Sequence, residues 1–294
     1  MRTCIISGGM IEPDFAFPYL QKQQFDIILA ADRGLEFCYH YQIMPTYILG
    51  DFDSLSPEIL NYYKENHVAP IREFNPMKDN TDTDIAFQQA IVLGSSEITI
   101  LGATGGRLDH FLSIVQNLKT AWEKKIPAYI VDSRNLITIP VETSFEIRKE
   151  EQFGKYVSFF PLEKEVASIT LEGFAYPLDH HYLPNTSGGL CVSNEIVEET
   201  AHVSYEGGIL LLVQSRDYNP LKSKSPCAII YSCIGLFLCI KKTRTEKEAK
   251  NKNKGDIDYY EIRYRGPSER RKKYTFQFPD QSRSRERKLS VLYH

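Results

Sequence analysis

The first 132 residues alternate short apolar runs with longer segments in which apolar side chains recur at helical spacing. The apolar runs predict strands over Thr3–Ser7, Ile27–Ala31, Tyr47–Leu49, Glu97–Leu101 and Ala128–Val131. The segments between them predict helices over Gly34–Tyr41, Pro57–Asn66, Thr83–Leu93 and Leu108–Lys124. Alternation of strands and helices is typical of a mostly parallel sheet that helices cover on both faces. The sequence therefore predicts an α/β domain over residues 1–132.

Two of these helices carry recognisable start signals. Ser56 supplies a hydroxyl cap, and Pro57 follows it in the first turn, where its missing N–H is not needed. Asp82 is expected to cap the next helix in the same way.

After Asp132 the pattern changes to short strands in which apolar and polar positions alternate. These strands are expected over Leu136–Val141, Phe145–Lys149, Tyr156–Pro161, Val166–Leu171, Ala201–Tyr205 and Gly208–Gln214. Turn residues separate them, and no long helical pattern lies between them. We predict a small antiparallel β domain, a sandwich, over residues 133–216.

Residues 217–294 form a third segment with a different charge. Residues 1–216 carry 16 Lys and Arg against 29 Asp and Glu, a net charge of −13, whereas residues 217–294 carry 19 against 9, a net charge of +10. The apolar run Cys227–Ile240 is shorter than the roughly 20 residues of a membrane-spanning helix, which favours a buried segment or an appendage over an anchor. We expect a basic, poorly ordered extension, and its composition favours a solvated tail over a nucleic-acid-binding segment.

The overall composition excludes some classes of protein. Hydrophobic residues make up 42% of the chain and charged residues 25%, which is too apolar for global disorder. The six cysteines form no C-x-x-C pair, which argues against a disulfide framework or a zinc ribbon. The apolar run at the N-terminus is too short for a signal peptide. These features favour a reducing cytosol, so we expect a cytoplasmic protein.

The first candidate for chemistry is Gly50-Asp51-Phe52-Asp53-Ser54, which follows an expected strand. Ligand sites in open α/β sheets lie beyond the carboxyl ends of the strands. Two aspartates one residue apart can converge on one hard cation if the backbone bends, and Gly50 permits a bend. Oxygen ligands suit Mg²⁺ better than zinc. The alternative is a polar turn with a helix cap.

The second candidate, Lys78-Asp79-Asn80-Thr81-Asp82-Thr83-Asp84, precedes an expected helix. Free N–H groups at a helix start bind anions, and Lys78 adds a positive charge for phosphate. The aspartates would repel bare phosphate, so they suit a metal held between carboxylate and phosphate. Helix capping is the alternative, but three aspartates within six residues exceed what one cap requires.

The third candidate is Gly102 to His110, between an expected strand and an expected helix. Its glycines allow close backbone approach to a phosphate, and Arg107 can hold two phosphate oxygens at once. Asp109 can orient Arg107 or reach a metal. The segment is neither a Walker A motif nor a G-x-G-x-x-G fingerprint, and a flexible turn is the alternative.

These segments and two weaker ones resemble a known family in content and in order. The matching pieces are Ala31-Asp32-Arg33-Gly34, Gly50 to Ser54, Lys78 to Asp82, Gly102 to His110, and Ser193-Asn194-Glu195. Over residues 1–216 the chain resembles thiamine pyrophosphokinase of the bacterial type. The resemblance implies an α/β nucleotide-binding domain followed by a β-sandwich. It also implies transfer of the diphosphate group of ATP to the hydroxyl of thiamine, giving thiamine diphosphate and AMP.

The resemblance also implies roles for individual residues. It implies that Mg²⁺ is held by Asp51, Asp53 and Asp82. It implies that ATP is bound by Asp32, Asp53, Ser54, Lys78, Asp79, Thr81, Gly102, Arg107 and Asp109. Thiamine contacts are implied for Asp82, Ser193 and Asn194, and catalytic roles for Asp51, Asp82 and Arg107. A homodimer, in which two subunits form the thiamine site, is implied as well.

Two other functions remain open at this point. One is a diphosphokinase of the same fold that acts on another alcohol, such as a pterin. The other is a nucleotide-sensing module tethered by the basic extension. The proton acceptor is also open, since either Asp82 or Asp51 can take the hydroxyl proton. The sequence does not firmly imply a nucleic-acid or membrane partner, and the extension has no counterpart in the family.

Overall fold

A computed structural model describes residues 1–73, 80–217, 239–242, 258–264, 272–278 and 290–291. The chain divides into two units, Met1–Asp217 and Tyr218–His294. Lys78, Asp79 and most of the apolar run Cys227–Ile240 lie outside the described residues. In the part of the chain that is described, no helix is both long and apolar enough to cross a membrane.

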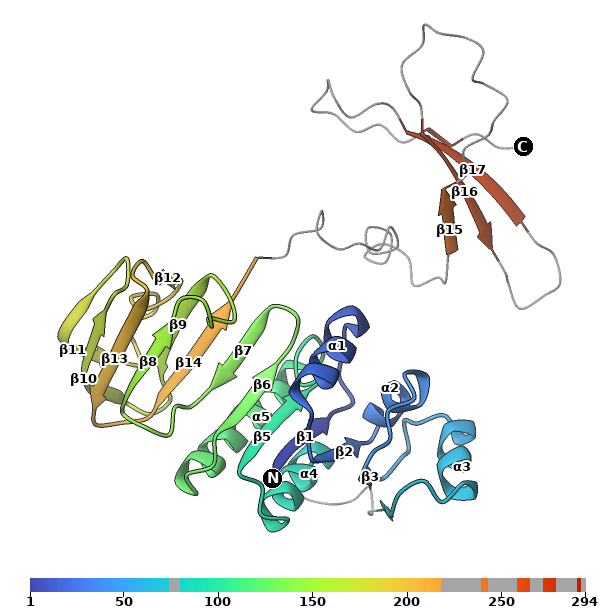
Figure 1. The fold of residues 1–294 in the computed structure, drawn as a ribbon, viewed down its shortest axis with the longest axis horizontal. Helices are drawn as coiled ribbons and strands as arrows, with labels where there is room; N and C mark the ends of the chain where they lie inside the picture. Colours follow the sequence, from blue (N-terminus) through green and yellow to red (C-terminus); the bar gives the residue numbers. More distant parts are fainter. Residues whose placement is uncertain (74–79, 218–238, 243–257, 265–271, 279–289, 292–294) are drawn as a thin grey trace, which may run out of the picture. The chain divides into compact units, whose positions relative to one another are not determined.

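Ten strands of the first unit form one continuous sheet in the order β12-β9-β14-β7-β6-β5-β1-β2-β3-β4 (Figure 1). The parallel part consists of β1 (Arg2–Ile6), β2 (Ile27–Ala31), β3 (Tyr47–Gly50), β4 (Ile71–Glu73), β5 (Glu97–Leu101) and β6 (Ala128–Val131). The antiparallel part consists of β7 (Asn135–Thr138), β9 (Tyr156–Pro161), β12 (Asn194–Glu195) and β14 (Leu210–Ser215). The carboxyl ends of the parallel strands therefore share one edge.

Helices cover both faces of the parallel strands, as the alternating pattern predicts. On one face lie α1 (Pro13–Gln23), α2 (Gly34–His40) and α3 (Pro57–Glu65), and on the other α4 (Asp82–Val92) and α5 (Leu108–Glu123). Successive residues of β1 pack on opposite faces of the sheet, since side chains along a strand alternate between faces. Ile5 packs in the cluster with α4 and α5, whereas Cys4 and Ile6 pack with the other helices.

A second sheet packs against the antiparallel part of the first. It contains β8 (Ser144–Arg148), β10 (Glu165–Glu172), β11 (Leu178–Pro184) and β13 (Thr200–Glu206), in the order β11-β10-β13-β8. Ile169 and Val203 from this sheet share a buried cluster with Phe159 and Leu212 from the long sheet. The predicted fold class, an α/β region followed by an antiparallel sandwich, is confirmed. The pattern did not reveal that one layer of the sandwich continues the α/β sheet.

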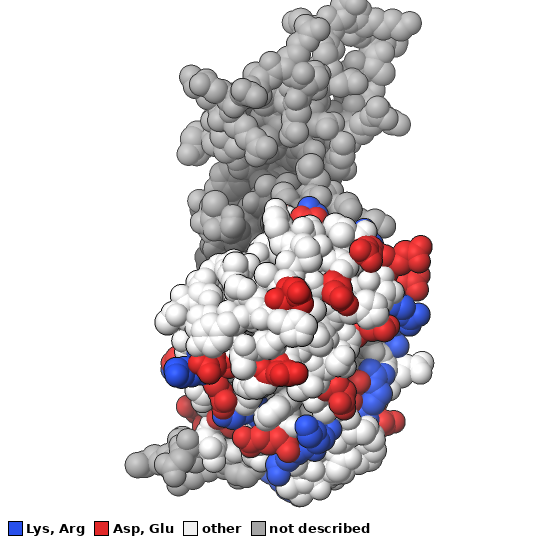
Figure 2. All heavy atoms as spheres, turned by 90° about the vertical axis from the view of Figure 1, so that its left-hand side faces the viewer, with Lys and Arg blue, Asp and Glu red and all other residues white. Residues whose placement is uncertain are grey.

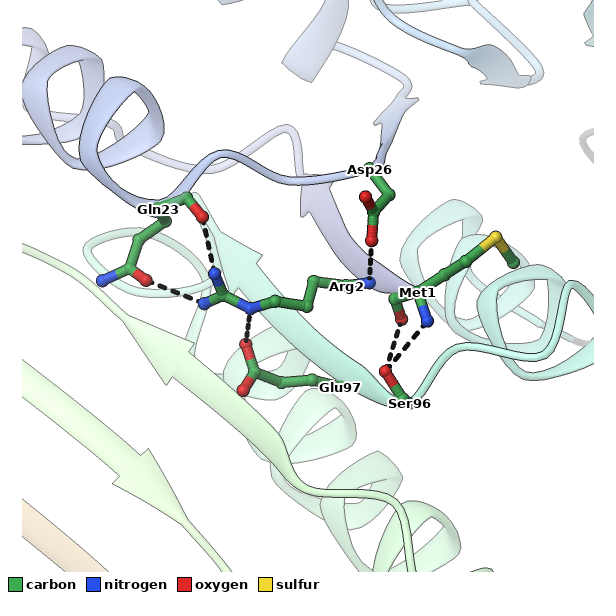
Figure 3. A network of polar contacts seen from close by, with 6 residues as sticks. All are labelled: Met1, Arg2, Gln23, Asp26, Ser96 and Glu97. Atoms are coloured by element: carbon green, nitrogen blue, oxygen red, sulfur yellow. Dashed lines mark hydrogen bonds and ion pairs between the residues drawn. The ribbon is translucent and has the colours of Figure 1, made fainter.

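The N-terminus is fixed at the opposite edge of the sheet from the carboxyl ends of the strands (Figure 3). The Arg2 guanidinium donates to Glu97 Oε1 at 2.9 Å and to the carbonyl and side-chain oxygens of Gln23 at 2.5 and 2.7 Å. The Arg2 backbone N–H donates to Asp26 Oδ2 at 2.7 Å. These contacts connect β1, α1 and β5 at the edge opposite the carboxyl ends of the parallel strands.

Several local expectations differ from the structure. Thr81, not Asp82, is the N-cap of α4, and Asp82 is its first helical residue. Ser56 is the N-cap of α3 but accepts no hydrogen bond through its side chain. The sequence pattern did not predict α1, which contains Pro18, nor β4, nor the edge strands β11 and β12.

The second unit contains an antiparallel sheet of four strands in the order β15-β16-β17-β18. Their bounds are β15 (Cys239–Lys242), β16 (Asp258–Tyr264), β17 (Lys272–Phe278) and β18 (Ser290–Val291). The expectation of a poorly ordered extension stays a prediction, because most of residues 217–294 lie outside the described residues. Alternation of Tyr260, Ile262 and Tyr264 with Glu261 and Arg263 is a strand period that the high charge of the segment obscured.

Candidate active site

Loops from several parallel strands meet at the carboxyl end of the sheet, and glycines allow them to pack closely. A Cβ on Gly34, just after β2, would lie 2.0 Å from the carbonyl oxygen of Ile6 in β1. A Cβ on Gly9, after β1, would lie 2.2 Å from the carbonyl oxygen of Gly102, after β5. Only glycine fits at these two positions, which brings the loops after β1, β2 and β5 into direct contact.

Three carboxylates converge where β2 and β3 end. One oxygen each from Asp32, Asp51 and Asp53 lies within 4.8 Å of the others. The Oδ1 atom of Asp32 is buried and has no hydrogen-bond partner among the described residues. Burial raises the pKa of Asp32, and the negative charges of Asp82, Asp51 and Asp53 raise it further, against a lowering by the backbone of Arg33. An unpartnered buried carboxylate oxygen beside two more carboxylates fits a divalent cation.

The backbone around Phe52 directs two of these carboxylates to one side. Phe52 has a φ of +59° and buries its ring in the cluster with α2 and α3. Asp51 and Asp53 therefore flank a buried residue, and one carboxylate oxygen of each lies in the same cluster. The Asp53 N–H donates to Asp51 Oδ1 at 3.3 Å, and the Ser54 hydroxyl donates to Asp53 Oδ1 at 2.8 Å.

The start of α4 brings Asp82 close to this cluster. Thr81 and Asp84 form a capping box, with the Asp84 N–H donating to Thr81 Oγ1 at 3.2 Å and the Thr81 N–H to Asp84 Oδ2 at 3.1 Å. Thr83 shares a buried hydrogen bond of 2.6 Å with Ser7 at the end of β1. The family resemblance implies that Asp82 joins Asp51 and Asp53 in the Mg²⁺ ligand set, and this stays a prediction. The oxygens that converge here are those of Asp32, Asp51 and Asp53.

Asp84 also connects α4 to α5. Its Oδ1 accepts from the Asn117 side-chain amide at 2.6 Å and from the Ser113 hydroxyl at 3.3 Å. The helix that presents Asp82 is therefore bonded to the helix whose first turn carries Asp109. No sequence motif indicated a role for Asn117. The sequence shows only that it is a polar residue on the inner side of an amphipathic helix.

Arg107 and Asp109 lie in the loop before α5 and in its first turn. The Arg107 guanidinium donates to both Asp109 oxygens, at 3.1 and 2.5 Å. Both side chains are largely exposed. The hydrogen bonds from Arg107 hold the pKa of Asp109 down to about 2. Leu108 and Leu112, one helical turn apart, are 74% and 60% exposed beside this pair.

The predicted thiamine motif lies at the other end of the sheet. Ser193 precedes β12, with a φ of +58°, and its N–H donates to Ser158 Oγ at 2.9 Å. Asn194 is buried, and its side chain bonds the backbone: Oδ1 accepts from Tyr176 N and Glu195 N, and Nδ2 donates to Tyr176 O. Asn194 therefore shapes the loop, while Ser193 stays exposed.

In sheet order, β12 is seven strands away from β2. At about 4.8 Å between neighbouring strands, this corresponds to roughly 34 Å along the sheet. Ser193 and Asp32 of one chain are therefore not brought together in one pocket.

The β domain exposes five large apolar side chains, all of them within about 20 residues of Ser193 in the sequence. They are Tyr176, Tyr182, Leu190, Val192 and Val197. Figure 2 looks at this end of the molecule and shows acidic side chains spread over it, with basic ones mainly toward its margins. A contiguous exposed apolar patch would mark a contact surface, whereas apolar side chains exposed singly are ordinary.

The comparisons with known proteins agree with this architecture. The model of the thiamin pyrophosphokinase catalytic domain matches residues 19–130, and that of its vitamin B1 binding domain matches residues 142–210. Thiamine pyrophosphokinase of Bacillus subtilis is 31% identical over 220 residues, which cover 74% of this chain and all of that protein.

Two solved structures are similar over the same share of the chain. The Bacillus subtilis enzyme has a TM-score of 0.67 at 29% identity, covering 74% of this chain and all of that one. The Geobacillus thermodenitrificans enzyme has a TM-score of 0.64 at 30% identity, covering 74% and 99%. Fold and site thus define an α/β enzyme with a cluster of three carboxylates at the carboxyl end of its parallel strands. The chain belongs to the thiamine pyrophosphokinase family.

Proposed function

We propose that this enzyme transfers the diphosphate group of ATP to the hydroxyl of thiamine, giving thiamine diphosphate and AMP. The observation that carries the proposal is the cluster of Asp32, Asp51 and Asp53, with its unpartnered buried oxygen, at the end of the parallel strands. The cluster lies within the residues that match the family's catalytic domain. A sensor that only binds a nucleotide has no need for so many converging carboxylates.

Asp32, Asp51 and Asp53 would hold a Mg²⁺ ion in this reaction, and Asp82 adds negative charge beside them. When bound, Mg²⁺ neutralises charge on the phosphate oxygens and favours attack at phosphorus. Burial is the main cause that raises the pKa of Asp32, and the negative charges of Asp82, Asp51 and Asp53, which a cation would offset, raise it further.

The chain's own residues then position the donor. Arg107 presents a planar fork that matches two phosphate oxygens, and Asp109 holds that fork in place. The predicted ATP contacts of Lys78 and Asp79 lie outside the described residues. Asp51 and Asp82 both remain candidates to accept the proton of the attacking hydroxyl.

We also propose that the enzyme acts as a homodimer, in which Ser193 of one subunit approaches the aspartate cluster of the other. Two observations support this. The separation along the sheet is too large for one chain to form the site alone. In addition, the apolar side chains around Ser193, and the exposed Leu108 and Leu112 beside Arg107, offer two surfaces that would cover each other.

Mixing two inactive variants tests the shared site. Asp51→Asn removes a carboxylate from the cluster, and Ser193→Tyr blocks the other half. If the halves come from different subunits, a mixed dimer contains one intact site, and activity returns on mixing. If each chain carries a complete site, the mixture stays as inactive as its components.

An assay with several acceptor alcohols separates thiamine from the alternative acceptors. Purified enzyme with MgATP should release AMP on addition of thiamine and not on addition of a pterin alcohol. AMP release with the pterin alone would support the alternative diphosphokinase. Nucleotide binding without AMP release from any acceptor would support the sensor. The three free cysteines described, Cys4, Cys38 and Cys191, support the cytosol as the proposed compartment.

A further inference from the structure

Strand β1 faces helix α4 with an apolar contact in the middle and a polar contact at each end. Thr3, Ile5 and Ser7 lie at alternate positions along β1 and just beyond it, so they share one face of the sheet. Ile5 lies in the buried cluster that also contains the apolar residues of α4, Ala86, Phe87 and Ala90. The two contacts that flank Ile5 are buried pairs of hydroxyl groups.

The first pair lies at the end of α4 that is away from the aspartates. Thr3 Oγ1 and Ser95 Oγ are 2.7 Å apart, and the Ser95 hydroxyl also donates to the carbonyl oxygen of Ala90 at 2.6 Å. This pair therefore connects the beginning of β1 to the last turn of α4. It satisfies two buried hydroxyl groups and lies far from the carboxyl ends of the strands.

The second pair lies where the aspartates gather. Ser7 Oγ and Thr83 Oγ1 are 2.6 Å apart, and the two residues are only 4% and 8% exposed. The Ser7 N–H donates to the carbonyl oxygen of Leu101 in β5 at 2.8 Å. A Cβ on Gly102 or on Gly34 would lie 2.5 or 3.1 Å from the Ser7 carbonyl oxygen. The loops after β2 and β5 thus enclose the backbone of Ser7, so its hydroxyl group is a fixed point for α4.

Thr83 directly follows Asp82, whose charge lies close to the aspartate cluster of Asp32, Asp51 and Asp53. Burial raises the pKa of Asp32, and the charge of Asp82 raises it further, which shows that these two carboxylates interact. Like charges repel, so without a cation the start of α4 is pushed away from the cluster. The capping box holds the first turn of α4 together, but it moves with the helix. The Ser7–Thr83 pair connects that turn to the sheet itself.

We propose that Ser7 and Thr83 are positioning residues, whose hydrogen bond holds Asp82 at a set distance from the aspartate cluster. The inference rests on the proposed function, because it takes Asp82 to act beside the cation during the transfer. Both hydroxyl groups are buried and act through the helix start, not on the substrates. Loss of the pair lets the helix start move outward, so that more Mg²⁺ is needed to bring the carboxylates together.

Substitutions at the two hydroxyl pairs separate positioning from simple stability. Thr83→Val keeps the shape of the side chain and removes its hydroxyl group, Ser7→Ala removes the other hydroxyl group, and Thr83→Ser retains one. Thr3→Val makes the same change in the first pair, on the same strand and equally buried, and is the matched control. Thermal melts at several Mg²⁺ concentrations and initial rates with MgATP and thiamine are measured for each variant.

We expect Thr83→Val and Thr3→Val to lower the melting temperature to a similar extent, because each leaves one buried hydroxyl group without its partner. Thr83→Val and Ser7→Ala should lower kcat by about tenfold and raise by about tenfold the Mg²⁺ concentration that gives a fixed rise in melting temperature. The KM for thiamine should change by less than about twofold in both. Thr83→Ser should restore kcat and the Mg²⁺ dependence, and Thr3→Val should leave them unchanged.

Unchanged kcat and Mg²⁺ dependence in the folded Thr83→Val and Ser7→Ala variants would overturn the inference. Equal losses in Thr3→Val, or failure of Thr83→Ser to restore them, would do the same. If Thr83→Val does not fold, Ser7→Ala decides. An unaltered enzyme that releases no AMP with thiamine would contradict the proposed function alone, since the Mg²⁺ dependence of melting still reports on the pair. If Mg²⁺ did not stabilise the unaltered enzyme at all, both would fail.

Discussion

Arg107 and Asp109 bind each other through two nitrogen–oxygen contacts, so the guanidinium fork already has a carboxylate partner in the absence of substrate. The hydrogen bonds from Arg107 lower the pKa of Asp109 to about 2, so the carboxylate is ionised at neutral pH and can accept from the guanidinium. A phosphate that approaches Arg107 must therefore share or displace an acceptor that is already aligned. The property of Arg107 to test is therefore the planar geometry of its guanidinium group as well as its positive charge.

Arg107→Lys keeps the positive charge but loses the fork. We expect kcat/KM for MgATP to fall by about 10- to 100-fold, because an ammonium group cannot hold two oxygens at fixed positions. Arg148→Lys is the matched control, since Arg148 makes a similar exposed pair with Glu151 on the sandwich. Steady-state kinetics that show equal effects of the two substitutions would reduce Arg107 to a surface charge.

Asp32 has a raised pKa, and its effect on stability follows from that direction. Between the ordinary carboxyl pKa and the raised value, the folded protein holds a proton that the unfolded chain has lost. Stability without metal should therefore decrease as pH rises through this window. Asp32→Asn should remove this decrease, raise the melting temperature of the metal-free protein near pH 7, and lower activity at least about 100-fold.

Thermal melts with and without Mg²⁺ complete this test. The unaltered enzyme should be stabilised by Mg²⁺, and more strongly at pH 8 than at pH 5, since ionised carboxylates bind the cation. The Asp32→Asn variant should lose most of that stabilisation. Asp179→Asn, an exposed aspartate on β11, is the control. Full Mg²⁺ stabilisation of the Asp32 variant would contradict the ligand set.

Asn117 is expected to affect stability and ATP binding because it donates a hydrogen bond to Asp84. Asn117→Ala removes a 2.6 Å hydrogen bond to a carboxylate, which should reduce the free energy of unfolding by about 1–3 kcal/mol. Because α4 presents Asp82, the KM for MgATP should also rise while the KM for thiamine changes little. Gln116→Ala, at the exposed neighbouring position, should do neither. Denaturant unfolding and initial rates measure the two effects, and an unchanged KM would limit Asn117 to stability.

The sequence predicts those parts of the fold in which hydrophobic period and turn chemistry agree. Strands Ile27–Ala31, Glu97–Leu101 and Tyr156–Pro161 have the predicted bounds. Helix α1 escaped prediction because Pro18 interrupts its pattern, although Ala16 and Leu20 still bury against the sheet. Strand β11 escaped because it lies at an edge, with only Leu183 buried, so it has almost no apolar period.

In the site, too, features set by the local sequence could be predicted, whereas features set by tertiary contacts could not. The loops themselves could be predicted, since each one follows a strand and is rich in Gly and Asp. The place of Asp32 in the cluster could not, because it depends on a φ of +47° and on the pairing of β2 with β3. The fully bonded side chain of Asn194 likewise depends on Tyr176, which is distant in the sequence.

Removal of the extension tests whether it contributes to the enzyme. A chain that ends at Asp217 contains every residue matched by the two family domains. We expect it to fold, keep full activity, and be more soluble than the whole chain, because Cys227–Ile240 is an aggregation hazard when exposed. If the truncated chain melted several degrees lower and lost turnover, the extension would belong to the functional fold.

The identity of the nucleotide product tests the central claim most directly. Diphosphate transfer from ATP releases AMP, whereas transfer of a single phosphoryl group would release ADP. Purified enzyme with MgATP and thiamine, followed by anion-exchange separation, should give AMP and thiamine diphosphate in equal amounts. Asp51→Asn, verified as folded, should give neither. ADP with thiamine monophosphate, or AMP formation that does not depend on thiamine, would contradict the account.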